Sequence, residues 1–315
     1  MQIIAGDIGG TKTLLRRVVT EGSDRKTVAE ERFESGAYAT FELLLSEFVS
    51  HHPGSIDAAC FAVAGPVLDG HAEVTNLTWD ISSASLQQQF PIEKVALIND
   101  FYAVALGVPL LGEADLRSLQ RGKRVSLAPI AILGAGTGLG EANLVHDGSK
   151  WNVVASEGGH ADFGPQDEQQ AGLYLSLQKQ YGHVSWERVL SGMGLVNIHN
   201  FLTGQDREYD DKIPAEIAKL AGAGDAMANR TFEIFVDIYG SEAGNMALRV
   251  LAGGGVFLAG GVAARNIDRF TDGRFAKAFL RKGRFEPVLA EIPVDLITNP
   301  EVGLIGAVEM AARLL

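Results

Sequence analysis

Two adjacent polar side chains, Asn99 and Asp100, end a short apolar run in the stretch ALINDFY, and an aromatic pair follows them. A strand that finishes on Asn-Asp can use the pair to cap the helix that comes next. The same place also suits chemistry, because a positioned carboxylate can take a proton from a reacting group. The pair by itself fits both a structural cap and a catalytic site.

Three further polar residues are candidates for ligand binding. Glu157 and His160 flank two glycines in EGGH, and Glu187 lies in HVSWERVLSG. His160 could instead be a structural histidine, and Glu187 could complement the dipole of a helix that begins near Ser185. Carboxylates, amides and imidazoles bind polyols well, because each sugar hydroxyl both donates and accepts hydrogen bonds. Together with the Asn-Asp pair, these side chains favour a hexose site.

Glycine-rich turns follow apolar runs at two places, GDIGGT at 6–11 and GAGTGLG at 134–140. The first turn is neither a P-loop nor a dinucleotide fingerprint, because a strand follows it and Lys12 comes after the threonine. It is either a type I′ hairpin, which needs positive φ, or a cradle of backbone N–H groups for phosphate oxygens. Asp7 would be repelled by phosphates unless a divalent cation lay between them, so it suggests magnesium. A third glycine-lined segment at 252–261 strengthens the case for a nucleotide site.

The elements that must position these residues alternate along the chain. Apolar runs such as EKVALIND and PIAILGAG are typical of buried parallel strands, and helices are expected over 40–50, 225–251 and 301–315. An early run of strands over 2–35 predicts antiparallel hairpins. The buried side of the long helix is expected to contain Met227, Ile234, Phe235, Ile238 and Tyr239. The pattern predicts an α/β fold, and the repeated strand and glycine turn hint at two similar lobes.

Composition narrows the classes of function. The chain has 315 residues, of which 46% are apolar, and a formal net charge of -12. The negative charge argues against nucleic acid and against an anionic membrane as partners. The single cysteine, Cys60, excludes an internal disulfide and a cysteine-based zinc site, and no other set of residues has transition-metal spacing. Neither a signal peptide nor a transmembrane run is recognisable, so a cytoplasmic protein is expected.

As a set, the motifs resemble those of a known family, the bacterial glucokinases without the zinc motif, within the hexokinase and actin superfamily. The matching stretches are GDIGGT, TNLTWDIS, LINDF, GAGTGLG, EGGHADFGP, GHVSWERVLSGMGLVN, GGVFLAGGVAAR, KGRF and IPVDLI. They follow the order of the family from residue 6 to residue 297, so the resemblance covers essentially the whole chain.

The resemblance implies two ribonuclease-H-like lobes around a central cleft, a small lobe of 1–109 plus 298–315 and a large lobe of 110–297. It implies ATP-dependent phosphorylation of glucose to glucose 6-phosphate, with ATP and Mg²⁺ as cofactors, and a cytoplasmic homodimer. Asp100 would be the general base for the 6-hydroxyl. The residues that would hold glucose are Asn99, Asp100, Glu157, His160 and Glu187. The residues that would bind the nucleotide are Gly6, Asp7, Ile8, Gly9, Gly10, Thr11, Gly134, Gly136, Thr137 and Gly138.

Three other functions stay open at this point. The same hydroxyl-binding residues could serve another hexose, such as mannose or an amino sugar. A sugar-sensing regulator would bind without turnover, although no helix-turn-helix pattern precedes the first turn and the net charge is negative. A chaperone-type ATPase of the same superfamily would lack the EGGH and HVSWE motifs.

Overall fold

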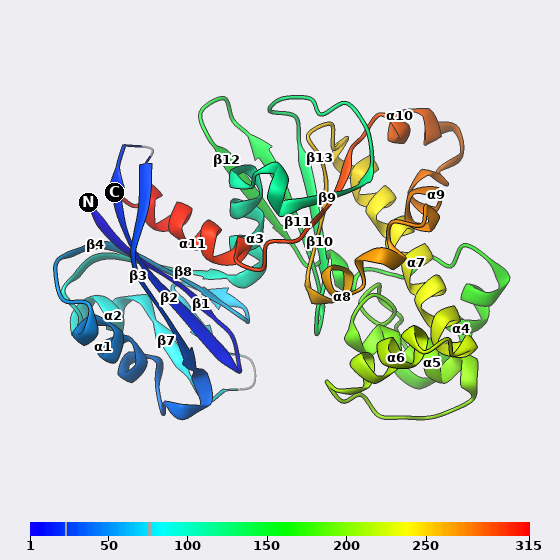
Figure 1. Ribbon diagram of the computed structural model, residues 1–315, viewed down its shortest axis with the longest axis horizontal. Coiled ribbons are helices and arrows are strands. Elements are labelled where there is room, and N and C mark those ends of the chain that lie inside the picture. The colour runs from blue at the N-terminus through cyan, green and yellow to red at the C-terminus, as the bar shows by residue number, and fades with distance from the viewer. Residues whose placement is uncertain (23, 75–76) are drawn as a thin grey trace. The chain divides into compact units, whose positions relative to one another are not determined.

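The computed structural model describes residues 1–22, 24–74 and 77–315, and it divides into two compact units. Unit 1 contains residues 1–111 and 299–315, and unit 2 contains residues 112–298. Figure 1 shows the C-terminal helix, drawn in red, among the elements of unit 1. Thr75 and Asn76, which begin the motif TNLTWDIS, lie outside the described residues.

Unit 1 is built on a sheet with the strand order β3-β2-β1-β4-β8. Strand β1 pairs antiparallel with β2 and parallel with β4, and β4 pairs parallel with β8. The expected antiparallel hairpins are therefore present. The bounds are β1 Gln2–Ile8, β2 Lys12–Glu21, β3 Asp24–Glu34, β4 Ile56–Val63 and β8 Ile92–Asn99, and a small separate sheet contains β5 Val67–Leu68, β6 His71–Glu73 and β7 Asp80–Ser82.

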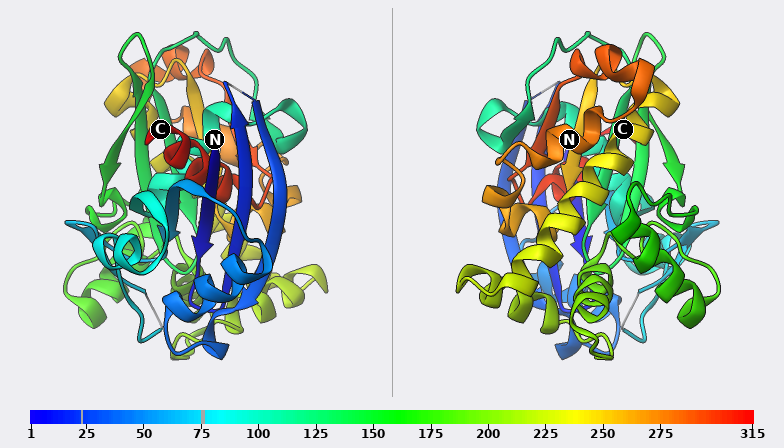
Figure 2. Two further views of the ribbon diagram at one scale, coloured as in Figure 1. Left: turned by 90° about the vertical axis from the view of Figure 1, so that its left-hand side faces the viewer. Right: turned by 90° about the vertical axis from the view of Figure 1, so that its right-hand side faces the viewer.

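Helices cover both faces of this sheet. The bounds are α1 Phe41–His51, α2 Ser83–Gln89, α3 Asp100–Gly107 and α11 Val302–Arg313. Because side chains alternate along a strand, Ile4 of β1 packs with α1 and α2, whereas Ile3 packs with α3 and α11. Cys60 of β4 is fully buried on the α11 side. The left view of Figure 2 shows β1, β2 and β3 side by side.

Unit 2 repeats the arrangement with a sheet of order β12-β11-β10-β13-β14-β9. Strand β10 pairs antiparallel with β11 and parallel with β13, as β1 does with β2 and β4. The sequence echo between the two glycine turns is thus a structural echo. The bounds are β9 Leu116–Gln120, β10 Ile130–Ala135, β11 Leu139–His146, β12 Trp151–Ser156, β13 Gly255–Ala259 and β14 Val294–Ile297.

The core of unit 2 lies around the long helix α7. Ile234, Phe235, Ile238 and Tyr239 are buried as expected, but Met227 is 44% exposed. Met227 lies in the first turn of the helix on its outer side, whereas the next residue, Ala228, is fully buried. The helices are α4 Glu168–Tyr181, α5 Gly192–Thr203, α6 Ile213–Gly222, α7 Ala226–Val250, α8 Gly261–Arg265, α9 Arg274–Leu280 and α10 Glu286–Ala290. The 3-10 helices of the two units are η1 Ser35–Ala37, η2 Val108–Leu110, η3 Glu113–Asp115, η4 Gly158–His160, η5 Ile267–Arg269 and η6 Gly283–Phe285.

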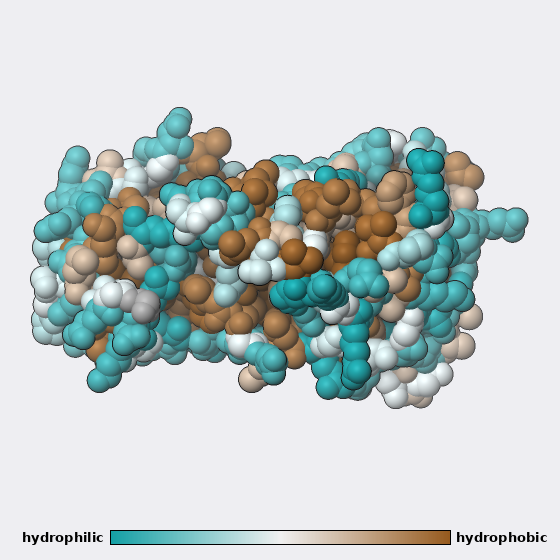
Figure 3. Space-filling view, turned by 90° about the horizontal axis from the view of Figure 1, so that it is seen from above, coloured by the Kyte–Doolittle hydropathy of each residue, from teal (hydrophilic) through white to brown (hydrophobic). Residues whose placement is uncertain are grey.

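The surface is mixed in character. Figure 3 shows hydrophobic residues in several groups, interrupted by hydrophilic ones, on the face that it draws. Large apolar side chains that are more than half exposed include Val125, Leu127 and Leu251. Among the helices of the described residues, none combines the length and the apolar character that crossing a bilayer requires.

Candidate active site

Asn99 and Asp100 lie at the junction of β8 and α3 in unit 1. Asn99 is the N-cap of α3, because its side-chain oxygen accepts hydrogen bonds from the backbone N–H groups of Phe101 (2.9 Å) and Tyr102 (3.2 Å). Its amide group donates to the Gly65 carbonyl (3.1 Å) and to the Asp100 carboxylate (3.0 Å). The cap that the sequence suggested is confirmed, and the same cap fixes the position of the Asp100 side chain.

Asp7 and Asp100 form a pair of carboxylates in unit 1 that repel each other. Burial first, and then the negative charge of Asp100, raise the pKa of Asp7 to about 6. Burial also raises the pKa of Asp100, while hydrogen bonds from the Phe101 N–H and the Asn99 amide partly oppose that rise. Because the two buried carboxylates repel each other, a cation bound beside them would offset that repulsion. The described residues contain no cluster of three or more His, Cys, Asp or Glu suited to a metal ion, so a magnesium ion here would need phosphate oxygens or water as further ligands.

The first glycine turn joins β1 to β2, and the side chain of Ser35 holds it. The Ser35 hydroxyl donates to the Gly9 carbonyl (2.8 Å) and lies 3.0 Å from the Thr13 hydroxyl, and the Ser35 N–H donates to the Thr11 carbonyl (2.9 Å). The non-glycine residues of the described chain with positive φ are Asp69, Leu127 and Leu251. Thr11 is not among them, and neither Gly9 nor Gly10 has positive φ, so the type I′ hairpin that the sequence allowed is wrong.

The residues flanking this turn face the protein core. Ile8 is fully buried, and a methyl group built on Gly6 would lie 2.7 Å from the side chains of Leu15 and Phe61. Gly6 and Ile8 could therefore meet a nucleotide only through their backbone. Gly9 is the first residue of the turn, and its N–H donates to the Lys12 carbonyl (3.0 Å).

The second glycine turn joins β10 to β11 in unit 2. It closes through the Gly136 N–H, which donates to the Gly138 carbonyl (2.8 Å), and the Gly192 N–H at the start of α5 donates to the Gly136 carbonyl (2.8 Å). A methyl group built on Gly136 would have no atom within 4 Å, so this glycine faces open space. The Tyr209 hydroxyl makes a side-chain hydrogen bond with Thr137. Gly136 is half-buried and its N–H and carbonyl are both hydrogen-bonded, so the open space beside its Cα and the exposed Thr137 are what this turn offers to phosphate oxygens.

The sugar candidates of unit 2 lie near this second turn. Glu157 and His160 border the short helix η4 and are exposed, with 4.0 Å between the Glu157 carboxylate and the His160 Nε2. The Glu187 carboxylate accepts from the Leu139 N–H (2.9 Å), and the Glu187 N–H donates to the Gly159 carbonyl (2.8 Å). Glu187 thus joins the end of the phosphate turn to the EGGH segment.

The expected helix start at Ser185 is wrong. Ser185 forms an isolated β-bridge with Asp162, and Glu187 lies in a turn. Helix α5 begins at Gly192 instead, where the Ser191 hydroxyl accepts from the Gly194 N–H (3.1 Å). Complementing a helix dipole is therefore not the role of Glu187.

The candidate residues divide between the two units, and within each unit the structure brings them together. Unit 1 holds Asp7, Asn99, Asp100 and the first turn, and unit 2 holds the second turn and the EGGH and Glu187 group. Sequence reasoning missed Ser35 and Tyr209. Nothing in the local sequence marks either residue, because their contacts with the turns join positions far apart in the chain.

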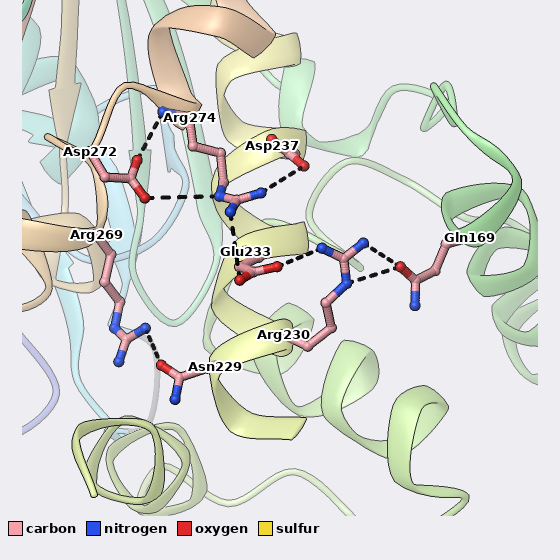
Figure 4. A network of polar contacts seen from close by, with 8 residues as sticks. All are labelled: Gln169, Asn229, Arg230, Glu233, Asp237, Arg269, Asp272 and Arg274. Atoms are coloured by element: carbon pink, nitrogen blue, oxygen red, sulfur yellow. Dashed lines mark hydrogen bonds and ion pairs between the residues drawn. The ribbon is translucent and has the colours of Figure 1, made fainter. Parts of the chain in front are cut away.

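A separate polar network ties α7 to α9 in unit 2 (Figure 4). Arg230 pairs with Glu233 (2.6 Å), which also lies 3.6 Å from Arg274, and Arg269 donates to the Asn229 side chain (2.9 Å). The network borders a cavity of ≈ 220 Å³. Its three arginines and three carboxylates balance one another in charge, which fits a structural role for the network.

Comparisons with known proteins agree with this geometry. Residues 4–314 match the family model described as Glucokinase. A glucokinase of Trichormus variabilis is 42% identical over 99% of both chains. The crystal structure of a glucokinase from an Antarctic psychrotroph is 31% identical, covers 99% of both chains and has a TM-score of 0.90. A ROK family glucokinase from Streptomyces griseus, solved with glucose and AMPPNP, shares the fold with a TM-score of 0.64 at 21% identity, over 99% of this chain and 100% of that one.

The matches first define a class, that of the two-lobe α/β phosphotransferases that act on hexoses. Within that class, the chain belongs to the glucokinase family. The α/β fold and the enzyme class that the motifs implied are both confirmed. The activity is therefore the ATP-dependent phosphorylation of glucose.

Proposed function

We propose that Asp100 is the general base of this reaction. Its carboxylate would accept the proton of the glucose 6-hydroxyl as that oxygen attacks the γ-phosphorus and ADP leaves. The observation that carries the proposal is the placement of Asp100, whose side chain is fixed by the Asn99 amide (3.0 Å) at the carboxyl end of a parallel strand. Open α/β sheets bind ligands at such strand ends. Burial raises the pKa of Asp100 and so makes its carboxylate a stronger base.

We further propose that the two glycine turns bind ATP and that Asp7 lies close to Mg²⁺. The glucokinase of Streptomyces griseus binds AMPPNP, an ATP analogue, together with glucose. The open space beside Gly136, where a methyl group would have no atom within 4 Å, supports the approach of a phosphate in this chain. The transition state of phosphoryl transfer is loose, so positioning of the phosphates and neutralisation of their charge supply most of the rate. Magnesium, when bound with ATP, would supply that neutralisation.

Glucose is proposed to contact Asn99, Asp100, Glu157, His160 and Glu187. Carboxylates accept strongly from sugar hydroxyls, and exposed side chains such as Glu157 and His160 are free to make those contacts. The lobes of the family are proposed to be 1–109 plus 298–315 and 110–297. A cytoplasmic homodimer also remains a proposal, and sedimentation of the purified protein would test its oligomeric state.

The decisive experiment is a coupled assay of ADP release over a panel of hexoses, with and without magnesium. We expect glucose to be the best substrate and magnesium to be required. Asp100→Asn should abolish most turnover while glucose still binds in calorimetry. Asp225→Asn is the matched control, because it changes a carboxylate that likewise lies at a helix N-terminus and caps it through the Ala228 N–H (2.8 Å). Normal turnover by the Asp100 variant would refute the proposed base.

A further inference from the structure

Glu141 is a buried acidic residue in unit 2 that the site described above does not use. It lies on β11, three residues after Gly138, and pairs with Ser156 of the neighbouring strand β12. Its side chain is 1% exposed. Strand β12 ends at Ser156, and the sugar candidates Glu157 and His160 follow directly. Glu141 therefore lies beneath the point where the chain leaves the sheet to form the EGGH segment.

The Glu141 carboxylate lies directly against Gly158. A methyl group built on Gly158 would overlap Glu141 Oε2 and would lie 3.0 Å from the Glu141 Cδ. Gly158 does not have positive φ, so alanine would suit its backbone. The Gly158 N–H donates to the Ser156 hydroxyl (2.9 Å), which fixes the turn over the carboxylate. Glycine at this position is therefore required by neighbouring side chains, Glu141 first and the Ser156 hydroxyl (3.0 Å) second, and not by the backbone conformation.

Arg249 of α7 anchors the carboxylate on its other side. Its Nη1 lies 3.8 Å from Glu141 Oε2 and 2.7 Å from the Oε1 of Glu242, whose side chain is fully buried. Lys282, which donates to the Ser241 hydroxyl (3.2 Å), is a second cation near Glu242. Glu141 Oε1 is buried and has no hydrogen-bond partner among the described residues. An unpartnered acceptor is costly when it is ionised, so the neutral carboxyl is favoured.

The electrostatics agree with the geometry. Burial first, and then the charge of Glu242, raise the pKa of Glu141 to about 7, although Arg249 opposes the rise. The Tyr239 hydroxyl is the other titratable group that senses the Glu141 charge, and its pKa is raised well above the ordinary value, mainly by burial. Burial also lowers the pKa of Lys282 to about 8, mainly against the attraction of Glu242. Glu141 thus changes its charge close to neutral pH.

We propose that Glu141 is a positioning residue for glucose binding. Its carboxylate fixes the position of Gly158 and thereby the positions of Glu157 and His160. The inference rests on the proposed function, in which the EGGH segment binds sugar. When Glu141 gains a proton, its repulsion from Glu242 ends and its hold on Arg249 weakens. The packing of Gly158 against the Glu141 side chain then changes, and glucose affinity changes with it. ATP affinity is not expected to follow to the same extent, because a methyl group built on Gly136 would have no atom of Glu141 within 4 Å.

The first test is a double-mutant cycle between Glu141 and Gly158. Gly158→Ala should raise the KM for glucose by about 2- to 150-fold, which corresponds to the 0.5–3 kcal/mol by which neighbouring residues interact. Glu141→Ala vacates the space that the new methyl group needs. The Glu141→Ala/Gly158→Ala enzyme should therefore bind glucose almost as well as Glu141→Ala alone. Losses that simply multiply in the double variant would overturn the proposal.

The second test is the pH dependence of the KM for glucose between pH 6 and pH 8.5. In the native enzyme the KM for glucose should change with a midpoint near pH 7. Glu141→Gln should remove this change, because glutamine keeps the contact with Gly158 but does not titrate. Glu242→Gln is the matched control. This substitution removes the charge that pairs with Arg249 and repels Glu141, and it leaves the contact with Gly158 in place. The KM of Glu242→Gln should therefore still change with pH, but with its midpoint at a lower pH. An unaltered inflection in Glu141→Gln would overturn the role of Glu141.

One further measurement separates this inference from the proposed function. Glucose titration of Glu157→Gln by calorimetry reports on the sugar site itself. Unaltered affinity in that variant would refute sugar binding by the EGGH segment, and with it the basis of the inference. Weakened affinity in Glu157→Gln, combined with additive losses at positions 141 and 158, would refute only the positioning role. Thermal unfolding of each variant without ligand checks that the fold is intact.

Discussion

Replacing Asp7 by asparagine should stabilise the ligand-free protein while it weakens ATP binding. The pKa of Asp7 is raised from 3.8 to about 6 in the folded protein, because burial and the charge of Asp100 disfavour ionisation. A carboxyl with a raised pKa supports the fold when it is protonated. That support is complete below the pKa of the unfolded chain and is lost as the pH rises to about 6. Above pH 6 the native protein therefore carries the full cost of an ionised Asp7.

The size of that cost follows from the change in pKa. At 1.36 kcal/mol per pKa unit, the ionised Asp7 lowers the free energy of unfolding by about 3 kcal/mol at pH 8. The asparagine side chain has no charge to desolvate, so the Asp7→Asn variant should be more stable than the native protein by about 3 kcal/mol at pH 8 and by only about 1 kcal/mol at pH 4.5. Urea unfolding at a series of pH values measures this difference directly.

A control and a second readout complete the experiment. Glu93→Gln changes an exposed carboxylate on β8 of the same unit and should leave the difference in unfolding free energy near zero at every pH. Calorimetry with ATP and magnesium should show weaker binding by the Asp7 variant, since its carboxylate is lost. An Asp7 variant that is no more stable than the native protein at pH 8 would refute the argument that burial holds the pKa of Asp7 high.

The remaining predictions concern the two ligands. Asp100→Asn should lower kcat by at least about 10²-fold with glucose affinity retained, which steady-state kinetics and calorimetry would check. Gly136→Val should weaken ATP far more than glucose, because the glycine faces open space; Gly222→Val, which faces open space in α6, should leave both affinities unchanged. Glu157→Gln should weaken glucose by about ten- to a hundredfold, from a lost charged hydrogen bond of about 1.5–3 kcal/mol. Glu187→Gln should weaken ATP as well as glucose, because the Leu139 N–H donates to that carboxylate.

Much of the fold was predictable because its signals are local. The cap at Asn99 follows from polar residues at a strand end, and the hairpins follow from glycine between apolar runs. The repeated strand and glycine turn hinted at two similar lobes, and the two units have sheets of similar order. Ser185 misled the prediction, since serine caps helices and also tolerates an extended bridge. Its pairing with Asp162 depends on a residue 23 positions earlier, and a local pattern does not reveal such a partner.

The residues that hold the site in place were not predictable from local patterns. Ser35 holds the first turn from 26 residues beyond Gly9, and Glu141 touches Gly158 across two strands. In the sequence, the glycines of EGGH served only as the residues between Glu157 and His160. The structure gives a reason for Gly158, which is the volume of a buried carboxylate beside it. Only the pairing of β11 with β12 brings those two residues together.

The duplicated sheet explains why only one of the two glycine turns needs a cation to bind phosphate. Strands β1 and β10 occupy equivalent places, each between its hairpin partner and a parallel strand, and the last pairs of the hairpins are Ile8 with Thr13 and Ala135 with Leu139. Asp7 in unit 1 therefore corresponds to Gly134 in unit 2. A turn that carries a carboxylate approaches phosphate oxygens only with a cation between them, whereas a turn without one can use its N–H groups directly. We accordingly expect magnesium to strengthen nucleotide binding mainly through unit 1, and Asp7→Asn to reduce that magnesium dependence more than Gly136→Val does.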